Sequence, residues 1–339
     1  MKKKQTKISK VQEQGTLGIA YLKTIWSSTI LKKQGIQNKN IELKHNYVTA
    51  VFDALGIGIE PTFKYIYEQS PSFESFENWV RDHGNLSSEM IAMVNVAILG
   101  SESEVKKTPY EDAILDDKAI AHWEKEGYVI IPNAISKTDC KASLDLIYGL
   151  LEIDPNNPAT WYNDHPLKQG IMVQLFRDPQ LDKNRFSKKI HSAYKQLWNR
   201  NTLIVSNDRV SFNPPENENY QFPGPNLHWD VSLKRPIPFG LQGLLYLTDT
   251  PANQGAFTLV PGFHKKIDQW LEHLPSTVNP RTSNLQELDP KPIAANAGDF
   301  IIWNQMLPHG SSPNTGTKPR VVQYINYQPI DREIANEWI

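Results

Sequence analysis

His228 and Asp230 lie two residues apart, separated by Trp229. On a β-strand this spacing puts both side chains on one face and the tryptophan on the other, where an aromatic ring can pack. A histidine and a carboxylate aimed at one point supply two ligands of the facial 2-His-1-carboxylate site that holds ferrous iron. By itself, His-x-Asp is a weak motif, because a solvated or core-satisfied pair is its commoner outcome. The hypothesis of an iron site therefore needs a second histidine.

His309 is the best candidate for that second histidine. It follows a predicted strand at Phe300–Trp303 and stands between Pro308 and Gly310, which suits a side chain fixed at the end of a strand. His264 is the rival, but the Pro-Gly turn before it and the two lysines after it predict an exposed position. The other histidines of the chain are His45, His83, His122, His165, His191 and His273.

Arg320 offers a means of holding a second small molecule beside the metal. The residues at 311–318 are predicted to turn, so the chain can double back and bring Arg320 close to His309. Its planar fork binds a carboxylate and stays charged inside a barrel, and Ser311 can add a hydroxyl. A 2-oxo acid would chelate the metal through its keto oxygen and near carboxylate, and oxygen would take the remaining position. For an arginine considered alone, a surface salt bridge is the usual outcome.

Taken in order, these residues resemble the phytanoyl-CoA dioxygenase family. The resemblance covers about residues 118–330. The ordered set of motifs is specific to the family, whereas no single motif is. It implies a mainly β fold, a double-stranded β-helix (jelly roll) with flanking helices, and dependence on Fe(II), 2-oxoglutarate and O2. One departure is Phe263, where the family usually has Ser or Thr. The matching pieces are the stretch Glu126 to Ile135, His228-Trp229-Asp230, the run from Asn253 to Lys265, Gly298-Asp299, His309-Gly310-Ser311 and Arg320.

The resemblance also assigns roles. It implies that His228, Asp230 and His309 bind the iron, and that Arg320 with Ser311 holds the tail of 2-oxoglutarate. Related halogenases have Ala or Gly at the position of Asp230, which opens a site for chloride, so a carboxylate there favours hydroxylation, desaturation or another oxidation. The expected enzyme is a cytoplasmic hydroxylase that releases succinate and CO2. Acyl thioesters or other carrier-bound compounds, free amino acids and natural products all fit as its substrate.

A polar stripe is predicted on the strand expected at 204–213. Asn207, Arg209 and Ser211 fall on one face by the two-residue period of a strand. Such a stripe entering a barrel would bind 2-oxoglutarate or a substrate carboxylate, and the alternative is a solvent-exposed face. On the next strand, Gln242 and Tyr246 share a face and are also expected to line the cavity.

Composition sets wider limits. The 339 residues are 39% hydrophobic and 22% charged, with a net charge of -1, so the chain as a whole gives no argument for binding nucleic acid or an anionic membrane. Residues 1–40 hold nine lysines and one glutamate, which indicates either a basic arm or a solvated leader, and the leader is favoured. No apolar run is long enough to span a membrane. The single Cys140 excludes an intrachain disulfide and fits a reducing cytoplasm.

Three domains are expected. Residues 1–45 form a basic, partly disordered leader, residues 46–115 a helical domain with a linker, and residues 116–339 the jelly-roll oxygenase domain. Helical periodicity and capping residues predict the helices of the second domain, whose role would be to cover the third domain or to dock a partner or carrier. The strands of the third are expected at 128–132, 171–176, 203–212, 227–232, 241–248, 256–260, 300–303 and 320–327.

Two other functions stay open at the level of sequence. One is a cupin-like metal enzyme that does not use 2-oxoglutarate, in which Arg320 would not be required. The other is a catalytically silent binding protein, in which the metal ligands would be dispensable. The complete set of ligands in the sequence argues against the silent protein.

Overall fold

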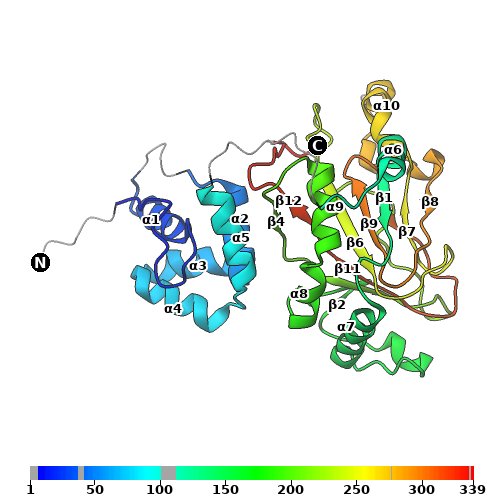
Figure 1. Cartoon of the computed structure of the whole chain (residues 1–339), viewed down its shortest axis with the longest axis horizontal. Helices are drawn as coiled ribbons and strands as arrows, with labels where there is room; N and C mark the ends of the chain where they lie inside the picture. Colours follow the sequence, from blue (N-terminus) through cyan, green and yellow to red (C-terminus); the bar gives the residue numbers. More distant parts are fainter. Residues whose placement is uncertain (1–6, 37–41, 101–111, 276, 336) are drawn as a thin grey trace, which may run out of the picture. The chain divides into compact units, whose positions relative to one another are not determined.

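The computed structural model of the chain describes residues 7–36, 42–100, 112–275, 277–335 and 337–339 (Figure 1). Over these residues the chain divides into two compact units. The helical unit takes in residues up to 107 together with 199–207 and 327–332, and the sheet unit comprises 108–198, 208–326 and 333–339. Two short stretches from the second half of the chain thus belong to the unit built mainly from the first.

Five helices make up most of the helical unit, and local signals explain their ends. Ser72 and Ser87 accept hydrogen bonds from backbone amides in the first turns of α4 and α5, and Gly56 ends α2 in a left-handed conformation. The helices are α1 (Leu22–Lys33), α2 (His45–Leu55), α3 (Ile59–Gln69), α4 (Phe73–His83) and α5 (Ser88–Leu99), joined by the two-stranded sheet of β4 (Ile204–Val205) and β12 (Tyr327–Gln328). The helices predicted between residues 46 and 100 are confirmed.

The prediction of a solvated leader is wrong for the segment around α1. Ile19, Leu22 and Ile25 are completely buried, and the indole of Trp26 donates to the carbonyl of Pro71. The apolar side chains of α1 are spread around the helix, which is typical of a helix packed on several sides. Residues 1–6 and most of the predicted linker after Gly100 lie outside the described residues.

The sheet unit contains a large and a small antiparallel sheet. The large sheet has the strand order β1-β9-β6-β11-β5-β3-β2, and the small one has the order β10-β7-β8. Neighbouring strands are mostly far apart in sequence, so this order could not be read from local signals. The strands are β1 (Tyr128–Ile131), β2 (Lys168–Gln169), β3 (Met172–Val173), β5 (Val210–Asn213), β6 (Leu241–Tyr246), β7 (Phe257–Leu259), β8 (Lys291–Pro292), β9 (Phe300–Asn304), β10 (His309–Ser311) and β11 (Arg320–Tyr324).

The core of the sheet unit lies between its two sheets. Alternate residues of β9, Ile301 and Trp303, join the same buried cluster as Phe257 and Leu259 of β7 in the small sheet. Phe300, the residue before Ile301 on β9, contacts Tyr194 of α9, so a helix covers the other face of the large sheet (Figure 1). Both faces of β9 are therefore buried.

Helices flank these sheets. Ser136 caps α7 by accepting a hydrogen bond from the amide of Asp139, as its sequence predicts. The helices of this unit are α6 (Asp117–Glu126), α7 (Lys137–Leu150), α8 (Pro179–Arg185), α9 (Lys188–Trp198) and α10 (Ile267–His273), with 3-10 turns at Pro158–Tyr162 (η2), Phe263–Lys265 (η3), Pro280–Thr282 (η4) and Leu285–Leu288 (η5).

Two predicted strands differ from the structure. The strand expected at 203–212 is split into β4 and β5 by irregular residues 206–209, and its two pieces belong to different units. The stretch 227–232 forms no strand, although His228 makes an isolated antiparallel bridge with His309. In these stretches the position of each side chain therefore depends on tertiary contacts and not on the two-residue period of a strand.

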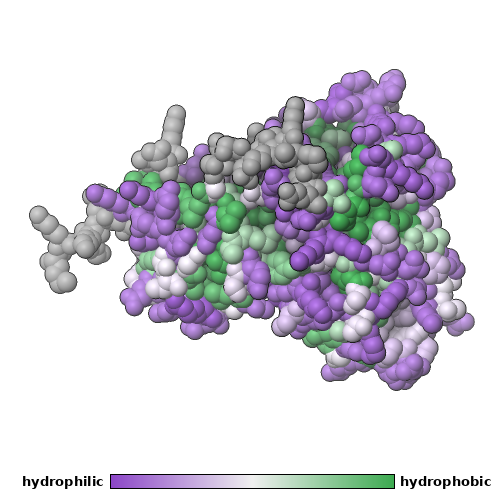
Figure 2. Space-filling view, viewed as in Figure 1, coloured by the Kyte–Doolittle hydropathy of each residue, from purple (hydrophilic) through white to green (hydrophobic). Residues whose placement is uncertain are grey.

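None of the described helices is long and apolar enough to cross a membrane. Figure 2 shows hydrophilic and hydrophobic residues interspersed over the visible face of the sheet unit.

Candidate metal centre

Two backbone segments bring the predicted metal ligands together. The amide of His228 donates to the carbonyl of His309 at 2.9 Å, and the amide of His309 donates back to the carbonyl of His228 at 3.0 Å. Gly310 permits this approach, because a Cβ atom there would lie 2.6 Å from the carbonyl oxygen of Asn226. The pairing fixes both histidines side by side, with their ring centroids 4.8 Å apart.

The side chains of His228, Asp230 and His309 converge on one point. One ligand atom from each lies within 4.8 Å of the others. His228 Nε2 is 3.4 Å from Asp230 Oδ1, and His309 Nε2 is 3.2 Å from Asp230 Oδ2. The Nδ1 atoms face the carbonyls of Asn226 and Leu307 at 2.7 and 3.0 Å, so a proton on each Nδ1 would leave both Nε2 atoms as ligands.

The electrostatics of this group suit a cation. Burial acts to raise the pKa of Asp230, but hydrogen bonds from His228 and His309 outweigh it and hold this pKa well below its usual range. Burial lowers the pKa of His228, and its hydrogen bonds to Asp230 and the carbonyl of Asn226 more than offset that effect, so this pKa lies above its usual value. The carboxylate is ionised and attracts positive charge, which a divalent metal would supply in place of a proton.

Aromatic packing supports the metal ligands from behind. Trp229 is 2% exposed and donates from its indole nitrogen to the carbonyl of Met306, so it points away from the ligands as predicted. The ring centroids of Phe263 and Trp270 lie 6.2 and 5.8 Å from that of Trp229. Phe263, the departure from the family pattern, is thus a packing residue of this cluster.

Arg320 is a buried cation without a carboxylate partner. It has no exposed surface, and among the described residues no carboxylate lies within ion-pair distance of it. Its two terminal nitrogens donate to the hydroxyls of Ser211 and Ser311 at 3.2 and 3.1 Å, while its Nε has no hydrogen-bond partner. Burying a guanidinium in this way is costly unless an anion binds it. The arrangement fits a carboxylate ligand.

A cavity of about 410 Å³ joins these features. The triad and Ser311 line it, and Arg320 lies behind Ser311. Phe257 and Trp303 form an apolar wall, with ring centroids 5.9 and 5.1 Å from that of His309. The remaining lining residues are Met172, Asp208, Arg209, Pro225, Gln242, Gly310, Tyr324 and Asn326.

The structure brings most, but not all, of the predicted site residues to this cavity. Arg209 lines it, Ser211 contacts Arg320, and Gln242 donates to Asp230 at 2.8 Å. The prediction is wrong for Asn207, which belongs to the helical unit and donates from its side chain to the carbonyl of Asp53. The irregular residues before β5 break the two-residue period that had put Asn207 on the same face as Arg209.

Two other predictions are settled by contacts. Tyr246 does not line the cavity, because it is buried in the core and its hydroxyl donates to the carbonyl of Ile293. His264 takes no part in the triad, and its ring lies against Gly127 at the end of α6.

Sequence reasoning missed three polar residues of the cavity. Tyr324 lies on the same strand face as Arg320, four residues later, so the strand period could have found it. Burial raises the pKa of Tyr324, and the charge of Arg320 and a hydrogen bond with it counteract part of that rise. Asp208 and Asn326 lie in irregular segments, and no local signal pointed to them. Burial raises the pKa of Asp208.

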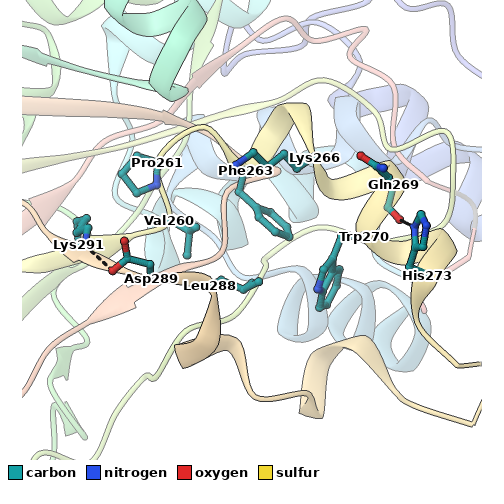
Figure 3. A pocket seen from close by; sticks show the side chains of 10 residues that line it. All are labelled: Val260, Pro261, Phe263, Lys266, Gln269, Trp270, His273, Leu288, Asp289 and Lys291. Atoms are coloured by element: carbon teal, nitrogen blue, oxygen red, sulfur yellow. Dashed lines mark hydrogen bonds and ion pairs between the residues drawn. The ribbon is translucent and has the colours of Figure 1, made fainter.

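A larger cavity, of about 650 Å³, lies elsewhere in the sheet unit (Figure 3). Phe263 and Trp270 line it, together with residues of α10 and of the segment before β8. No member of the metal triad lines it. Size alone therefore does not locate the candidate metal centre.

Comparisons with known proteins agree with the geometry. A family model described as Phytanoyl-CoA dioxygenase (PhyH) matches residues 123–322. A Dictyostelium discoideum protein named as a candidate phytanoyl-CoA dioxygenase is 23% identical over 258 residues, which cover 61% of this chain and 74% of that relative. Methylphosphonate hydroxylase of Gimesia maris is 19% identical over 223 residues, which cover 64% of this chain and 82% of that protein.

Two complexes are among the solved structures that the comparison matched. The epimerase SnoN, solved with Fe3+, alpha ketoglutarate and nogalamycin RO, has a TM-score of 0.47 and 19% identity, and the match covers 62% of this chain and 82% of SnoN. HygX from Streptomyces hygroscopicus, solved with nickel, 2-oxoglutarate and hygromycin B, has a TM-score of 0.46 and 16% identity, and the match covers 63% of this chain and 88% of HygX.

Proposed function

The chain belongs to the phytanoyl-CoA dioxygenase family, and from this premise we propose that it is an Fe(II)- and 2-oxoglutarate-dependent dioxygenase. It hydroxylates an unactivated C–H bond of a small-molecule or carrier-bound substrate and releases succinate and CO2. The observation that carries the proposal is the cavity in which two histidine Nε2 atoms and a carboxylate converge beside a buried arginine with no carboxylate partner among the described residues.

The donor set fits the cofactors of this family. His228, Asp230 and His309 would hold Fe(II) through two imidazoles and one carboxylate, the ligand set of non-haem iron oxygenases. Arg320 would hold the far carboxylate of 2-oxoglutarate, and its unpartnered Nε and the two serine hydroxyls support that role. When bound, the iron and 2-oxoglutarate supply the activation of O2 and the oxidation of the substrate.

The protein's own residues position and shield this chemistry. Gln242 orients Asp230 through its 2.8 Å hydrogen bond, and the carbonyls of Asn226 and Leu307 orient the two imidazoles. Phe257 and Trp303 exclude water from one wall of the cavity. Asp230 occupies the position that a halogenase would leave open for chloride, which supports hydroxylation over halogenation.

The proposal extends to the fold and to the division of the chain. The two antiparallel sheets that enclose the core support assignment of the sheet unit to the double-stranded β-helix of the family. A helical domain before about residue 115 and an oxygenase domain after it remain part of the proposal, with residues 199–207 and 327–332 added to the helical unit.

Anaerobic addition of Fe(II) and 2-oxoglutarate to the purified protein tests the proposal. We expect the weak visible charge-transfer band of the iron chelate of a 2-oxo acid. His309→Ala should abolish this band, and Arg320→Ala should shift its appearance to higher 2-oxoglutarate concentrations. A wild-type protein that binds iron stoichiometrically but gives no band would contradict the proposal and favour a cupin-like enzyme without an oxo acid.

A further inference from the structure

Two arginines lie at or beside the cavity of the candidate metal centre, and they differ in burial. Arg320 is fully buried behind Ser311, whereas Arg209 lines the cavity directly and its side chain is 35% exposed. 2-Oxoglutarate has two carboxylates, of which the near one binds the metal and the far one is assigned to Arg320 above. With the near carboxylate on the metal and the far one at Arg320, Arg209 is not required to hold either end of 2-oxoglutarate.

The guanidinium of Arg209 packs against an aromatic ring, but its Nε makes no hydrogen bond to the described residues. Its guanidinium carbon lies 5.8 Å from the centroid of the Phe176 ring, a distance typical of a cation-π contact. Its Nε is 4.0 Å from Asp208 Oδ1, which is too long for a hydrogen bond, and within the described part of the chain this buried nitrogen has no hydrogen-bond partner. A buried donor without a partner costs free energy, and an acceptor from a ligand would remove that cost.

A chain of hydrogen bonds connects Arg209 to the metal ligands. Asp208 accepts from the backbone amide of Arg209 at 2.8 Å and from the side chain of Asn326 at 3.0 Å. Asn326 in turn accepts from the amide of Gly243, at 2.9 Å. The neighbour of Gly243 on β6, Gln242, donates to Asp230. The backbone of Arg209 therefore has a fixed position relative to the point where the chemistry would occur.

We propose that Arg209 is the anchor for an oxyanion of the substrate, so that this enzyme acts on a small molecule that carries a carboxylate or a phosphonate. The inference rests on the function proposed above, because it assigns 2-oxoglutarate to Arg320. The planar fork of an arginine binds either oxyanion through two parallel hydrogen bonds. Asp208 supports the backbone of Arg209 by accepting the hydrogen bond from its amide.

The size of the cavity agrees with this class of substrate. About 410 Å³ must accommodate 2-oxoglutarate as well as the reacting part of the substrate. A short anionic molecule fits such a space with its charged end at Arg209 and a C–H bond near the metal. Anchoring one end in this way would fix which carbon is oxidised.

Two measurements on the Fe(II)-loaded protein test the role of Arg209. The first is the dissociation constant of 2-oxoglutarate, from the charge-transfer band, in wild type, Arg209→Gln and Arg209→Lys. The second uses straight-chain carboxylates from propionate to hexanoate, alkylphosphonates of the same lengths and the matching primary amides. It records how each compound perturbs the band and stimulates succinate formation. Arg235→Gln is the matched control, since Arg235 forms an ion pair with Glu272 away from the cavity.

We expect Arg209→Gln and Arg235→Gln to bind 2-oxoglutarate like wild type. At least one acid should perturb the band and stimulate succinate formation in the wild type and in Arg235→Gln, whereas its amide should do neither. In Arg209→Gln the apparent affinity for that acid should fall by about tenfold or more. Arg209→Lys should retain part of the response, more for a phosphonate than for a carboxylate, because a lysine keeps the charge but not the fork.

Three results would overturn the proposal. Weaker binding of 2-oxoglutarate in Arg209→Gln would return Arg209 to the co-substrate. Equal action of acids and amides would remove the need for a charged anchor, and so would a failure of every acid to act on a wild-type protein that shows the band. Absence of the band in wild type would refute the proposed function itself, which separates the two failures.

Discussion

Two of the cavities in the sheet unit differ in character, and the smaller of these two carries the features of an active site. The side chains of His228 and Asp230 line the cavity of about 410 Å³. Trp229, between them in sequence, packs against Phe263 and Trp270, which line the cavity of about 650 Å³. One short stretch of chain therefore contributes to the surroundings of both.

The two cavities differ in how their polar groups are satisfied. In the larger one, Lys291 forms an ion pair with Asp289, and His273 Nδ1 lies 2.7 Å from the carbonyl of Gln269 (Figure 3). In the smaller one, ligand atoms of opposite charge converge, and buried nitrogens of Arg209 and Arg320 have no partner. Unsatisfied polar groups that converge indicate function more reliably than volume does, because protein folding tolerates few of them without a reason.

The largest expected effect comes from removing a metal ligand. His309→Ala should reduce metal affinity by more than the roughly 10–100-fold typical of changes around a metal's ligands, and should abolish turnover. Metal content after dialysis against Co(II) measures this. His264→Ala is the control, because this histidine lies outside the triad. Retention of wild-type Co(II) affinity by His309→Ala would rule out the assigned ligand set.

Removing the buried arginine should have opposite effects on function and stability. Arg320→Met should weaken 2-oxoglutarate binding by about 100-fold, or about 3 kcal/mol, because a buried charge pair is lost. Without 2-oxoglutarate the variant should be at least as stable as wild type, since an unpaired buried guanidinium is replaced by an apolar side chain of similar length. Titration of the charge-transfer band and urea unfolding measure the two effects. Lower stability with unchanged affinity would assign Arg320 a purely structural role.

Substitution of Gln242 tests whether its hydrogen bond to Asp230 contributes to metal affinity. Gln242→Leu removes the hydrogen bond to Asp230 and should lower metal affinity by about 10-fold. Gln269→Leu, in the larger cavity, is the matched control and should leave metal affinity unchanged. Competition between the protein and a metallochromic indicator for Co(II) measures both variants. Equal effects of the two substitutions would mean that the cavities are not distinct in function.

Metal binding should depend on pH in the direction set by His228. Its pKa lies above the usual value of 6.5, so protons compete with metal at pH values where an ordinary histidine would already be neutral. Co(II) affinity should rise by about tenfold per pH unit as pH increases through the pKa of His228, and then level off. Isothermal titration calorimetry in buffers of different ionisation enthalpy gives the affinity and the proton release. A flat profile from about pH 6 to about pH 8 would argue against His228 as a ligand.

The smallest functional effect is expected in the larger cavity. Trp270→Ala removes part of the aromatic cluster behind Trp229 and should lower the free energy of unfolding by about 1–2 kcal/mol, less than for a fully buried tryptophan. Co(II) and 2-oxoglutarate affinities should stay near wild type. Loss of metal binding in this variant would show that the larger cavity controls the metal ligands through Trp229.

Helices were easier to predict than strands because their signals are local. Ser136 and Ser87 cap the helices that their sequences predict, and Gly56 ends another. Strand pairing depends on partners distant in sequence, so residues 206–209 could interrupt a predicted strand without any visible signal. The buried position of α1 was missed for the same reason, because basic charge near the start of the chain does not report what the apolar residues contact.

The amino-acid sequence was enough to predict the chemical set His228, Asp230, His309 and Arg320, which has the order and spacing of a known family. These residues could be identified because metal and carboxylate binding require particular side-chain types. Which other residues join them followed from the packing of distant segments, which places Asp208 and Asn326 in the cavity and Asn207 outside it. It also decided the settings of Arg209 and Arg320, because burial and the absence of a partner arise from contacts between distant segments.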